Sequence, residues 1–523
     1  MSAERWYFPK QSPASLGIDS AGVERFLDAL ENEHIDIHSF LMIRHGKLAV
    51  EGYWTPYSPD KPYTLFSASK TFTAMGVGFA IQDGLLRTDD QVILHFQEEV
   101  EAIGADNICE NMKKVTIWNL LTMTVGFEED PHDFPFEGRT DWIRNFLTAR
   151  VHHEPGNKFV YSTHASYMLS ALVQKVTGKT LWAYLQEKLF TPLEITGEWW
   201  EESPQHISVG GWGLMLVTED YAKIGQFLLQ NGKWNGQQLL DADWVREAVS
   251  CQVSNRENPT PNPMDAPDFQ SGYGYQIWRL RKEDAYMASG GFGQYVMVLP
   301  KKDAVVAMTC GTHEDHLFEN IWKELYPALK DDMAETGAGA GQSSGEAGAQ
   351  QSGDDMAADQ ALQERMNRLS IPLPAGNAHH ESMEKNYHQV VYQFENNRYG
   401  FQKISFDFSE KEPKITLTLP EGAFTVKAGF GRWIDGKTSI LLEDTDTDLN
   451  AIYPDVSCAY AWEDGALILK MVYDHTPFYD TFRIGFYDAV LKIKAQRNVW
   501  HYGETIDPVL YGFCPEKAEE KTK

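Results

Sequence analysis

The chain has 523 residues, a formal net charge of −29 and a hydrophobic content of 42%. A chain of this length exceeds a single hydrophobic core and predicts two or three domains. The acidity, with no cluster of basic residues, excludes a nucleic-acid-binding face. Five scattered cysteines without C-x-x-C spacing exclude structural zinc and a disulfide framework, and they indicate a reducing compartment.

Targeting signals are missing from the sequence pattern. Residues 1–10 carry charges and lack the apolar core of a secretory signal. No stretch approaches the roughly 20 apolar residues of a membrane span. We therefore expect a cytoplasmic protein without a membrane partner.

The first 330 residues alternate between strand-like and helix-like patterns. Apolar runs at residues 40–44 and 47–53 predict one hairpin, and runs at 295–299 and 304–309 predict a second. Helical patterns lie between them, at residues 71–83, 117–123, 165–177, 181–189, 219–230 and 243–249. Strands at both ends with helices between predict an α+β domain over residues 1–330, in which both ends share one antiparallel sheet flanked by helices.

The composition changes after residue 330. Residues 331–359 are rich in Gly, Ala, Ser, Gln, Asp and Glu, and such a segment cannot bury enough apolar surface to offset its ordering entropy. We predict a flexible linker over residues 331–381, with a short helix at 360–369. Short alternating runs then follow at 392–394, 404–408, 415–419 and 466–470. They predict a C-terminal antiparallel β domain over residues 382–515.

Ser67-Ala68-Ser69-Lys70 opens the apolar helical stretch at residues 71–83. A serine and a lysine three apart stand on one helix face, and the first turn supplies free N–H groups and a positive dipole end. This arrangement can activate a serine without a histidine. The same spacing also occurs at Ser58 and Ser382, but no apolar helix follows either of them.

Two later features suit the same chemistry. Tyr161 stands on the approach to a predicted helix, where a tyrosine near a cation can transfer protons. His164, three residues on, either tunes this tyrosine or lies on the outer face of the helix. The Gly-rich segment from Ala288 to Gln294 opens a strand whose N–H groups can face an acyl oxygen beside the Ser67 N–H.

Together these residues resemble the penicillin-recognising serine hydrolases, which include class C β-lactamases, DD-peptidases and related esterases. Residues 67–73 are similar to that family's first motif, Tyr161-Ser162-Thr163 to its Tyr-x-Asn motif in part, and Ala288-Ser289-Gly290 to its Lys-Thr-Gly position. The segments at 116–126 and 210–220 agree, so the resemblance covers residues 15–328. It implies a β-lactamase/transpeptidase-like fold, whose helices between the strands form a helical subdomain.

The resemblance also implies a transient acyl-enzyme. Ser67 is then the nucleophile, Lys70 and Tyr161 are the proton-transfer pair, and the N–H groups of Ser67 and Gly291 form the oxyanion hole. Substrate binding falls to the residues at the second and third motifs, Thr163, Ser289 and Gly290.

Two departures from the family pattern limit the class of substrate that is expected. Thr163 replaces an asparagine amide, and Ala288 removes the cation that pairs with a substrate carboxylate. Losing one partner of such a pair typically costs on the order of 2–5 kcal/mol. We therefore expect an ester, amide or peptide substrate that is less acidic than a β-lactam.

Alternatives are a β-lactamase or D-alanyl peptidase, or a non-catalytic peptide- or glycan-binding protein on the same fold. The sequence contains no ligand set at metal spacing and no cofactor motif, so neither a metal nor a cofactor is predicted. The expected partner is a small-molecule or peptide substrate.

Overall fold

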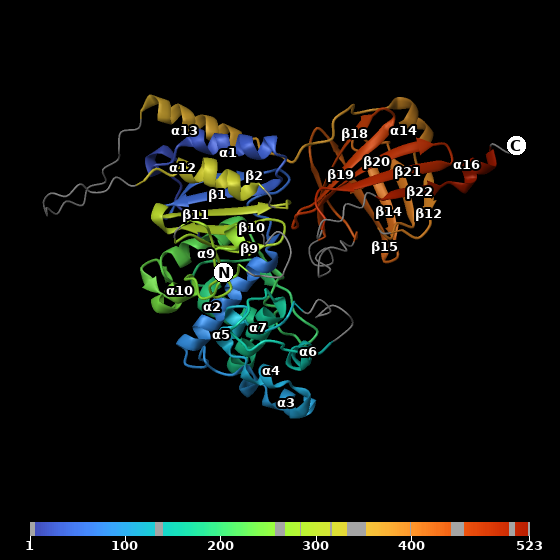
Figure 1. Cartoon of the computed structure of the whole chain (residues 1–523). Coiled ribbons are helices and arrows are strands. Elements are labelled where there is room, and N and C mark those ends of the chain that lie inside the picture. Colours follow the sequence, from blue (N-terminus) through green and yellow to red (C-terminus); the bar gives the residue numbers. More distant parts are fainter. Residues whose placement is uncertain are drawn as a thin grey trace. The chain divides into compact units, whose positions relative to one another are not determined.

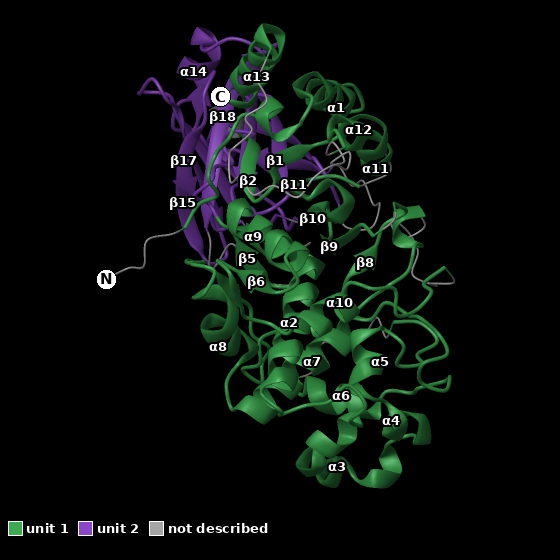
Figure 2. Ribbon diagram, turned by 90° about the vertical axis from the view of Figure 1, so that its left-hand side faces the viewer, with its two compact units in different colours: residues 1–52, 62–367 green, residues 53–61, 368–523 purple. Residues whose placement is uncertain are grey.

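The computed structural model describes residues 6–130, 140–256, 267–282, 284–313, 316–331, 352–397, 399–440, 454–500 and 508–520. The chain divides into two units (Figure 2). The first unit contains Met1–Gly52 and Pro62–Asn367, and the second contains Tyr53–Lys61 and Arg368–Lys523. The sequence predicted boundaries at residues 330 and 381. The division instead falls after Asn367, and residues 53–61 belong to the second unit.

A central antiparallel sheet organises the first unit (Figure 1). Its strands follow the order β2-β1-β11-β10-β9-β8 among the described residues. Their bounds are β1 Ile37–Arg44, β2 Lys47–Tyr53, β8 Trp278–Arg279, β9 Tyr286–Gly290, β10 Gln294–Leu299 and β11 Ala304–Cys310. Phe40 of β1 lies opposite Met308 of β11, so the two predicted hairpins join edge to edge. The predicted sheet made by both ends of the domain is confirmed.

Helices cover both faces of this sheet (Figure 1). On one face, Phe26 of α1 (Ser20–Asn32) contacts Phe40 of β1, with 5.6 Å between ring centroids. On the other face lies α9 (Thr218–Leu229), where a Cβ on Gly225 would meet Val305 at 2.5 Å and Val296 at 2.6 Å. The glycine lets this helix approach the sheet closely.

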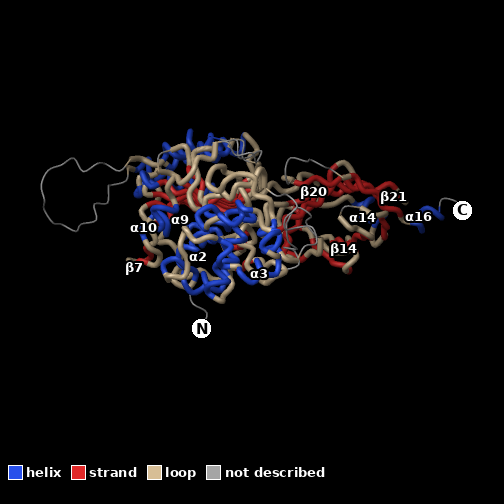
Figure 3. Tube along the Cα trace, turned by 60° about the horizontal axis from the view of Figure 1, so that its bottom comes forward, coloured by secondary structure: helices blue, strands red, loops and turns tan. Residues whose placement is uncertain are grey.

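Helices are drawn in blue in Figure 3. Of the remaining helices of the first unit, α11 and α12 contact α1, whereas α2, α5, α6, α7 and α8 contact one another. Their bounds are α2 Ser69–Gln82, α3 Gln97–Ile103, α4 Glu110–Lys114, α5 Ile117–Leu121, α6 Trp142–Thr148, α7 Thr163–Thr177, α8 Leu181–Leu185, α10 Ala242–Ala248, α11 Leu317–Asn320 and α12 Tyr326–Ala328. Every residue of α2 from Ser69 to Ala80 is buried, because the helix runs through the interior with α7 beside it.

Short strands complete the first unit. The β3-β5-β4 sheet consists of β3 Tyr63–Thr64, β5 Leu214–Leu216 and β4 Trp199–Trp200. A separate pair consists of β6 Lys233–Trp234 and β7 Gln237–Gln238. Leu65 N donates to Leu214 O at 2.9 Å, so β3 leads the chain directly to Ser67.

The structure describes residues 352–381 of the segment predicted as a linker. A helix does occur there, but it spans Gly353–Met366 (α13) and belongs to the first unit. Arg365 reaches three acidic side chains of α1, with N–O distances of 2.5 Å to Glu24, 2.7 Å to Asp28 and 2.9 Å to Glu31. Leu362 and Met366 of α13 are also buried, so apolar contacts hold this helix together with the guanidinium. Residues 332–351 lie outside the described residues.

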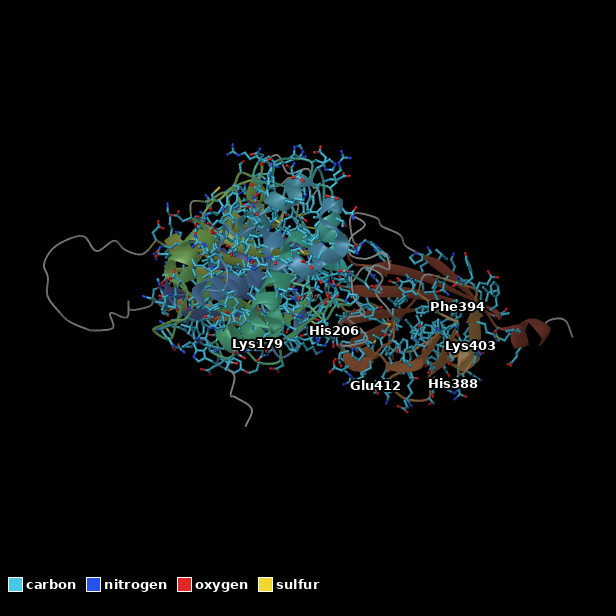
Figure 4. The ribbon with its side chains drawn as sticks, turned by 90° about the horizontal axis from the view of Figure 1, so that it is seen from below. Lys179, His206, His388, Phe394, Lys403 and Glu412 are labelled. Carbon is cyan, nitrogen blue, oxygen red and sulfur yellow. The ribbon has the colours of Figure 1, made fainter. Side chains whose placement is uncertain are left out.

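The second unit is built on a mainly antiparallel sheet, as predicted, in which β16 (Gly429–Phe430) pairs with β18 (Asp455–Glu463) in parallel. Its strand order is β15-β14-β13-β12-β22-β21-β20-β19-β18-β16, with β17 also paired to β18. The bounds are β12 Val391–Phe394, β13 Lys403–Asp407, β14 Lys414–Leu419, β15 Gly422–Lys427, β16 Gly429–Phe430, β17 Ile434–Lys437, β18 Asp455–Glu463, β19 Ala466–Tyr473, β20 Tyr479–Tyr487, β21 Val490–Arg497 and β22 Val509–Phe513, with helices α14 Glu381–Tyr387 and α16 Pro515–Glu520. Figure 4 labels Phe394 on β12 and Lys403 on β13, which are adjacent antiparallel strands.

A short N-terminal segment, residues 53–61, also belongs to the second unit. Thr55 exchanges backbone hydrogen bonds with Leu369 and Ile371, at 3.1 and 2.9 Å. Tyr57 is buried, and its hydroxyl donates to Thr476 O at 3.1 Å. Lys61 Nζ lies 2.7 Å from a carboxylate oxygen of the buried Asp474. The chain therefore enters the second unit and leaves it again six residues before Ser67.

Candidate active site

Ser67 and Lys70 lie where the sequence placed them, at the start of a buried helix. Ser67 is the middle residue of a 3₁₀ turn, Phe66–Ala68, that runs directly into α2. Lys70 is 1% exposed, and its Nζ donates to Ser67 Oγ at 2.9 Å. Phe66, just before the serine, has φ 46°, a left-handed conformation that costs a non-glycine residue about 1–3 kcal/mol.

A carbonyl oxygen holds the lysine from its other side. Lys70 Nζ donates to Gly211 O at 2.7 Å. The neighbouring Gly210 O accepts from Thr73 Oγ1 at 2.7 Å, so this glycine segment lies along α2. A Cβ on Gly211 would lie 2.5 Å from Thr163 Cγ2, which shows how closely the segment also approaches α7. Sequence reasoning missed Gly211 as a lysine partner; its only signal was the paired glycines.

Tyr161 joins this pair from the approach to α7. Its ring centroid lies 4.9 Å from Lys70 Nζ, and the side chain is 8% exposed. The ring stacks on Trp278, with centroids 5.4 Å apart and an interplanar angle of 27°. Burial, with a smaller contribution from Tyr161, holds the pKa of the neighbouring Tyr273 well above its usual value. Tyr273 therefore stays neutral beside Tyr161.

The third predicted motif lies at the end of β9, against the turn that contains Ser67. A Cβ on Gly290 would lie 2.0 Å from Leu65 O and 3.1 Å from Ala68 N, so only glycine fits there. A Cβ on Gly291 would lie 3.9 Å from the Phe66 ring. The structure thus brings Gly290 and Gly291 together with Ser67.

The predicted substrate-binding residues differ in exposure. Thr163, the first residue of α7, and Ser289 on β9 are partly exposed, whereas Gly290 is buried. Ala288 is also buried in β9, and its carbonyl oxygen accepts from Tyr221 Oη at 3.4 Å.

His164 is buried, and its Nδ1 lies 3.4 Å from Asp130 Oδ1. It therefore does not lie on the outer face of the helix.

Within the described part of the chain, no group of three or more His, Cys, Asp and Glu side chains is arranged to hold a metal ion. None of the helices there combines the length and apolar character needed to cross a membrane.

The first unit is similar to known proteins. The family model described as Beta-lactamase matches residues 25–324. Protein flp of Staphylococcus aureus (strain COL) is 27% identical over 180 residues, which are 32% of this chain and 35% of that protein. The aligned part is thus about a third of that relative's length. Uncharacterized protein BpOF4_21049 of Alkalihalophilus pseudofirmus is 21% identical over 304 residues, covering 51% of this chain and 81% of that protein.

One solved structure shares the fold of the first unit. It is described as "Putative 6-aminohexanoate-dimer hydrolase from Bacillus anthracis", with a TM-score of 0.51 and 19% identity, over 63% of this chain and 88% of that one. The family match covers more than half of the 523 residues and includes the positions of Ser67, Lys70, Tyr161 and Gly291. The chain belongs to the Beta-lactamase family.

Proposed function

We propose that the protein is a serine hydrolase that acts through an acyl-enzyme on an ester, amide or peptide substrate. The observation that carries the proposal is the hydrogen bond from Lys70 Nζ to Ser67 Oγ, 2.9 Å long, with the Tyr161 ring 4.9 Å from the same ammonium nitrogen. A nucleophile in hydrogen-bond contact with a proton-transfer group is the signature of covalent catalysis. A protein that only binds a ligand has no need of all three side chains.

The proposed reaction has two halves. Ser67 Oγ attacks the substrate carbonyl carbon, and its proton passes to the Lys70–Tyr161 pair, which in the free enzyme holds one proton fewer than a lysine ammonium beside a neutral tyrosine. The pair returns this proton to the leaving oxygen or nitrogen as the bond to the acyl carbon breaks. A water molecule then attacks the acyl-enzyme, gives its proton to the pair, and releases the acid and free Ser67.

Charge develops on the substrate oxygen during both halves. The N–H groups of Ser67 and Gly291 are proposed to stabilise it, because the β9 end lies against the 3₁₀ turn that contains Ser67. Fixed backbone donors in a site that excludes water contribute about 10²–10³-fold each to the rate. Thr163 and Ser289, both partly exposed, are proposed to contact the substrate beside these donors.

The substrate is proposed to lack the carboxylate that β-lactams and terminal D-alanine carry. Ala288 stands where a relative with those substrates has a cation, and its side chain is buried in β9. The Nζ of Lys70 is already hydrogen-bonded to Ser67 Oγ and Gly211 O. An esterase, amidase or peptidase acting on neutral acyl groups follows from this arrangement.

Covalent labelling tests the proposal. The wild-type protein treated with a fluorophosphonate should gain the mass of one adduct, and the adduct should be absent from folded Ser67→Ala. Ser382→Ala is the matched control, because Ser382 has the same three-residue spacing to a lysine, Lys385, on an exposed helix. That variant should be labelled like the wild type.

A folded wild-type protein without an adduct would contradict the proposal and leave the binding-protein alternative. A labelled protein is then given matched esters, amides, short peptides and a chromogenic cephalosporin. Turnover of the cephalosporin above that of the neutral esters would overturn the proposed substrate class in favour of a β-lactamase.

A further inference from the structure

The turn that contains Gly291 has an unusual backbone. Residues 290–293 connect β9 to β10, and Gly293 N donates to Gly290 O at 3.2 Å. Phe292 and Gly293 both have positive φ, 63° and 93°. A positive φ at the third position of a turn is normally taken by glycine, so Phe292 needs support from its surroundings.

Gln294, the next residue, provides contacts on the inside of this turn. The side chain is 0% exposed, and its Nε2 donates to Gly291 O at 3.0 Å and to Cys310 O at 3.0 Å. Its Oε1 accepts from Cys310 N at 3.2 Å. One carboxamide therefore ties the carbonyl of Gly291 to the last residue of the central strand β11.

This contact bears on the proposed oxyanion hole. Glycine has more backbone freedom than any other residue. The N–H of Gly291 therefore keeps its orientation towards the substrate oxygen only if the turn around it is held in place. On one side, Leu65 O limits the movement of Gly290, since a Cβ there would lie at 2.0 Å. On the other side, the carboxamide of Gln294 fixes the Gly291–Phe292 peptide. Preorganised donors are effective because they need no reorientation during the reaction.

We propose that Gln294 is a positioning residue of the oxyanion hole. Its amide holds the 290–293 turn so that Gly291 N–H faces the same point as Ser67 N–H. The inference rests on the proposed function, since it concerns the same reaction. It assigns to a buried side chain, outside the three catalytic motifs, the alignment of one donor.

The test compares an ester with its thionoester, in which sulfur replaces the carbonyl oxygen. Sulfur is a poor hydrogen-bond acceptor, so a working hole makes kcat/KM much larger for the ester. In Gln294→Met, which fills the space without an amide, this ratio should fall by about tenfold or more, in kcat rather than KM. Gln294→Glu also removes both donors while keeping the acceptor for Cys310 N, and its ratio should fall as well. Either folded variant alone is sufficient to test the positioning role.

Asn255→Leu is the matched control. Asn255 is also 0% exposed; its Nδ2 donates to Phe269 O at 2.8 Å and to Gly272 O at 3.5 Å, and its Oδ1 accepts from Gly272 N at 2.9 Å. This variant loses a comparable set of buried bonds without touching the 290–293 turn. It should lower the melting temperature and keep the wild-type ratio of ester to thionoester turnover.

The outcomes separate the two proposals. A fluorophosphonate adduct on the wild type, with an unchanged ratio in folded Gln294→Met or Gln294→Glu, overturns the positioning role and leaves the hydrolase proposal standing. A ratio that falls equally in Asn255→Leu also overturns it, because the effect is then general destabilisation. Absence of any adduct on the wild type overturns the proposed function and this role with it.

Discussion

Phe66 and Phe292 contact each other edge to face, with ring centroids 5.3 Å apart and an interplanar angle of 67°. Both have positive φ, 46° and 63°. Phe66 directly precedes Ser67, and Phe292 directly follows Gly291. Each of the two proposed oxyanion donors is thus next to a strained aromatic residue, and the two strained residues stabilise each other through their rings. Strain held in this way is expected at functional sites.

The contact predicts an unusual order of stabilities at position 292. Phe292→Ala and Phe292→Gly both lose the buried ring, at a cost of about 3–5 kcal/mol. At φ 63° alanine retains the left-handed strain and glycine does not, so the glycine variant should be more stable by about 1–2 kcal/mol. Chemical denaturation of the two variants measures the difference. A glycine variant less stable than the alanine variant, the order found in ordinary backbone, would contradict the strain.

The hydroxyl of Tyr161 is expected to matter for rate and not for stability. Tyr161→Phe keeps the ring stacked on Trp278 at 5.4 Å and removes only the oxygen. Because the proposed proton relay loses one member, kcat should fall about 10²–10⁴-fold while the melting temperature changes little. Tyr273→Phe is the control: that hydroxyl belongs to a neutral, buried ring, and its loss should leave kcat near wild type. An equal fall in kcat in both variants would contradict a specific role of the Tyr161 hydroxyl in proton transfer.

Gly211 and Thr163 should be coupled. A methyl group added by Gly211→Ala would lie 2.5 Å from Thr163 Cγ2, so the segment must move and withdraw the carbonyl that holds Lys70. We expect Gly211→Ala to lower kcat by about tenfold or more through misplacement of the lysine. Thr163→Ser removes the clashing methyl group, so the double variant should recover part of the loss. A double-variant cycle with strictly additive effects would show that the two residues act independently.

The ion pair between Lys61 and Asp474 predicts a pH-dependent stability of the second unit. Burial raises the pKa of Asp474 above its usual value, although Lys61 and Ser457 oppose this rise. The pKa of Asp474 is therefore higher in the folded state than the usual value of about 3.9 for an unfolded chain. This carboxyl contributes most to stability at pH values below about 3.9, and its contribution is lost as the pH rises through the pKa of the folded state. Without Lys61 the carboxylate is buried unpaired, which typically costs about 3–5 kcal/mol.

Lys61→Met should therefore destabilise the second unit strongly at neutral pH and much less at acidic pH, where Asp474 is protonated. Urea titrations at a series of pH values measure this difference. The control is Lys437→Met, because Lys437 is exposed and pairs with Asp455 at 3.2 Å, a contact worth about 1 kcal/mol or less. A Lys61→Met loss that does not depend on pH would mean that the ion pair is not the cause.

Local patterns in the sequence were enough for much of the fold and for the central residues of the site. The hairpin signals at both ends of the first unit predicted the β1–β11 pairing, because strands without other partners must share one sheet. The i, i+3 spacing of Ser67 and Lys70 predicted their contact. Tyr161 followed from the order of the motifs, and the structure places it over the same ammonium.

The missed features depend on backbone groups or on distant pairs. Gly211 contributes a carbonyl oxygen, which every residue carries, so no side-chain pattern could indicate it. Gln294 looks like any polar strand residue until its partners on the neighbouring strand are known. Lys61 pairs with a residue 413 positions away, and no local pattern indicates that partner. Arg365 likewise bonds to α1 across more than 300 residues.

Residues 53–61 belong to the second unit, although they lie within the sequence of the first. The polypeptide crosses between the units three times, after Gly52, after Lys61 and after Asn367. A single truncation therefore cannot remove the second unit as a whole. A protein ended at residue 367 would retain the nine residues whose partners it had lost, with the ring of Tyr57 and the ammonium of Lys61 released into solvent just ahead of the nucleophile. Removing the second unit completely therefore takes two deletions, of residues 53–61 and of the chain after residue 367.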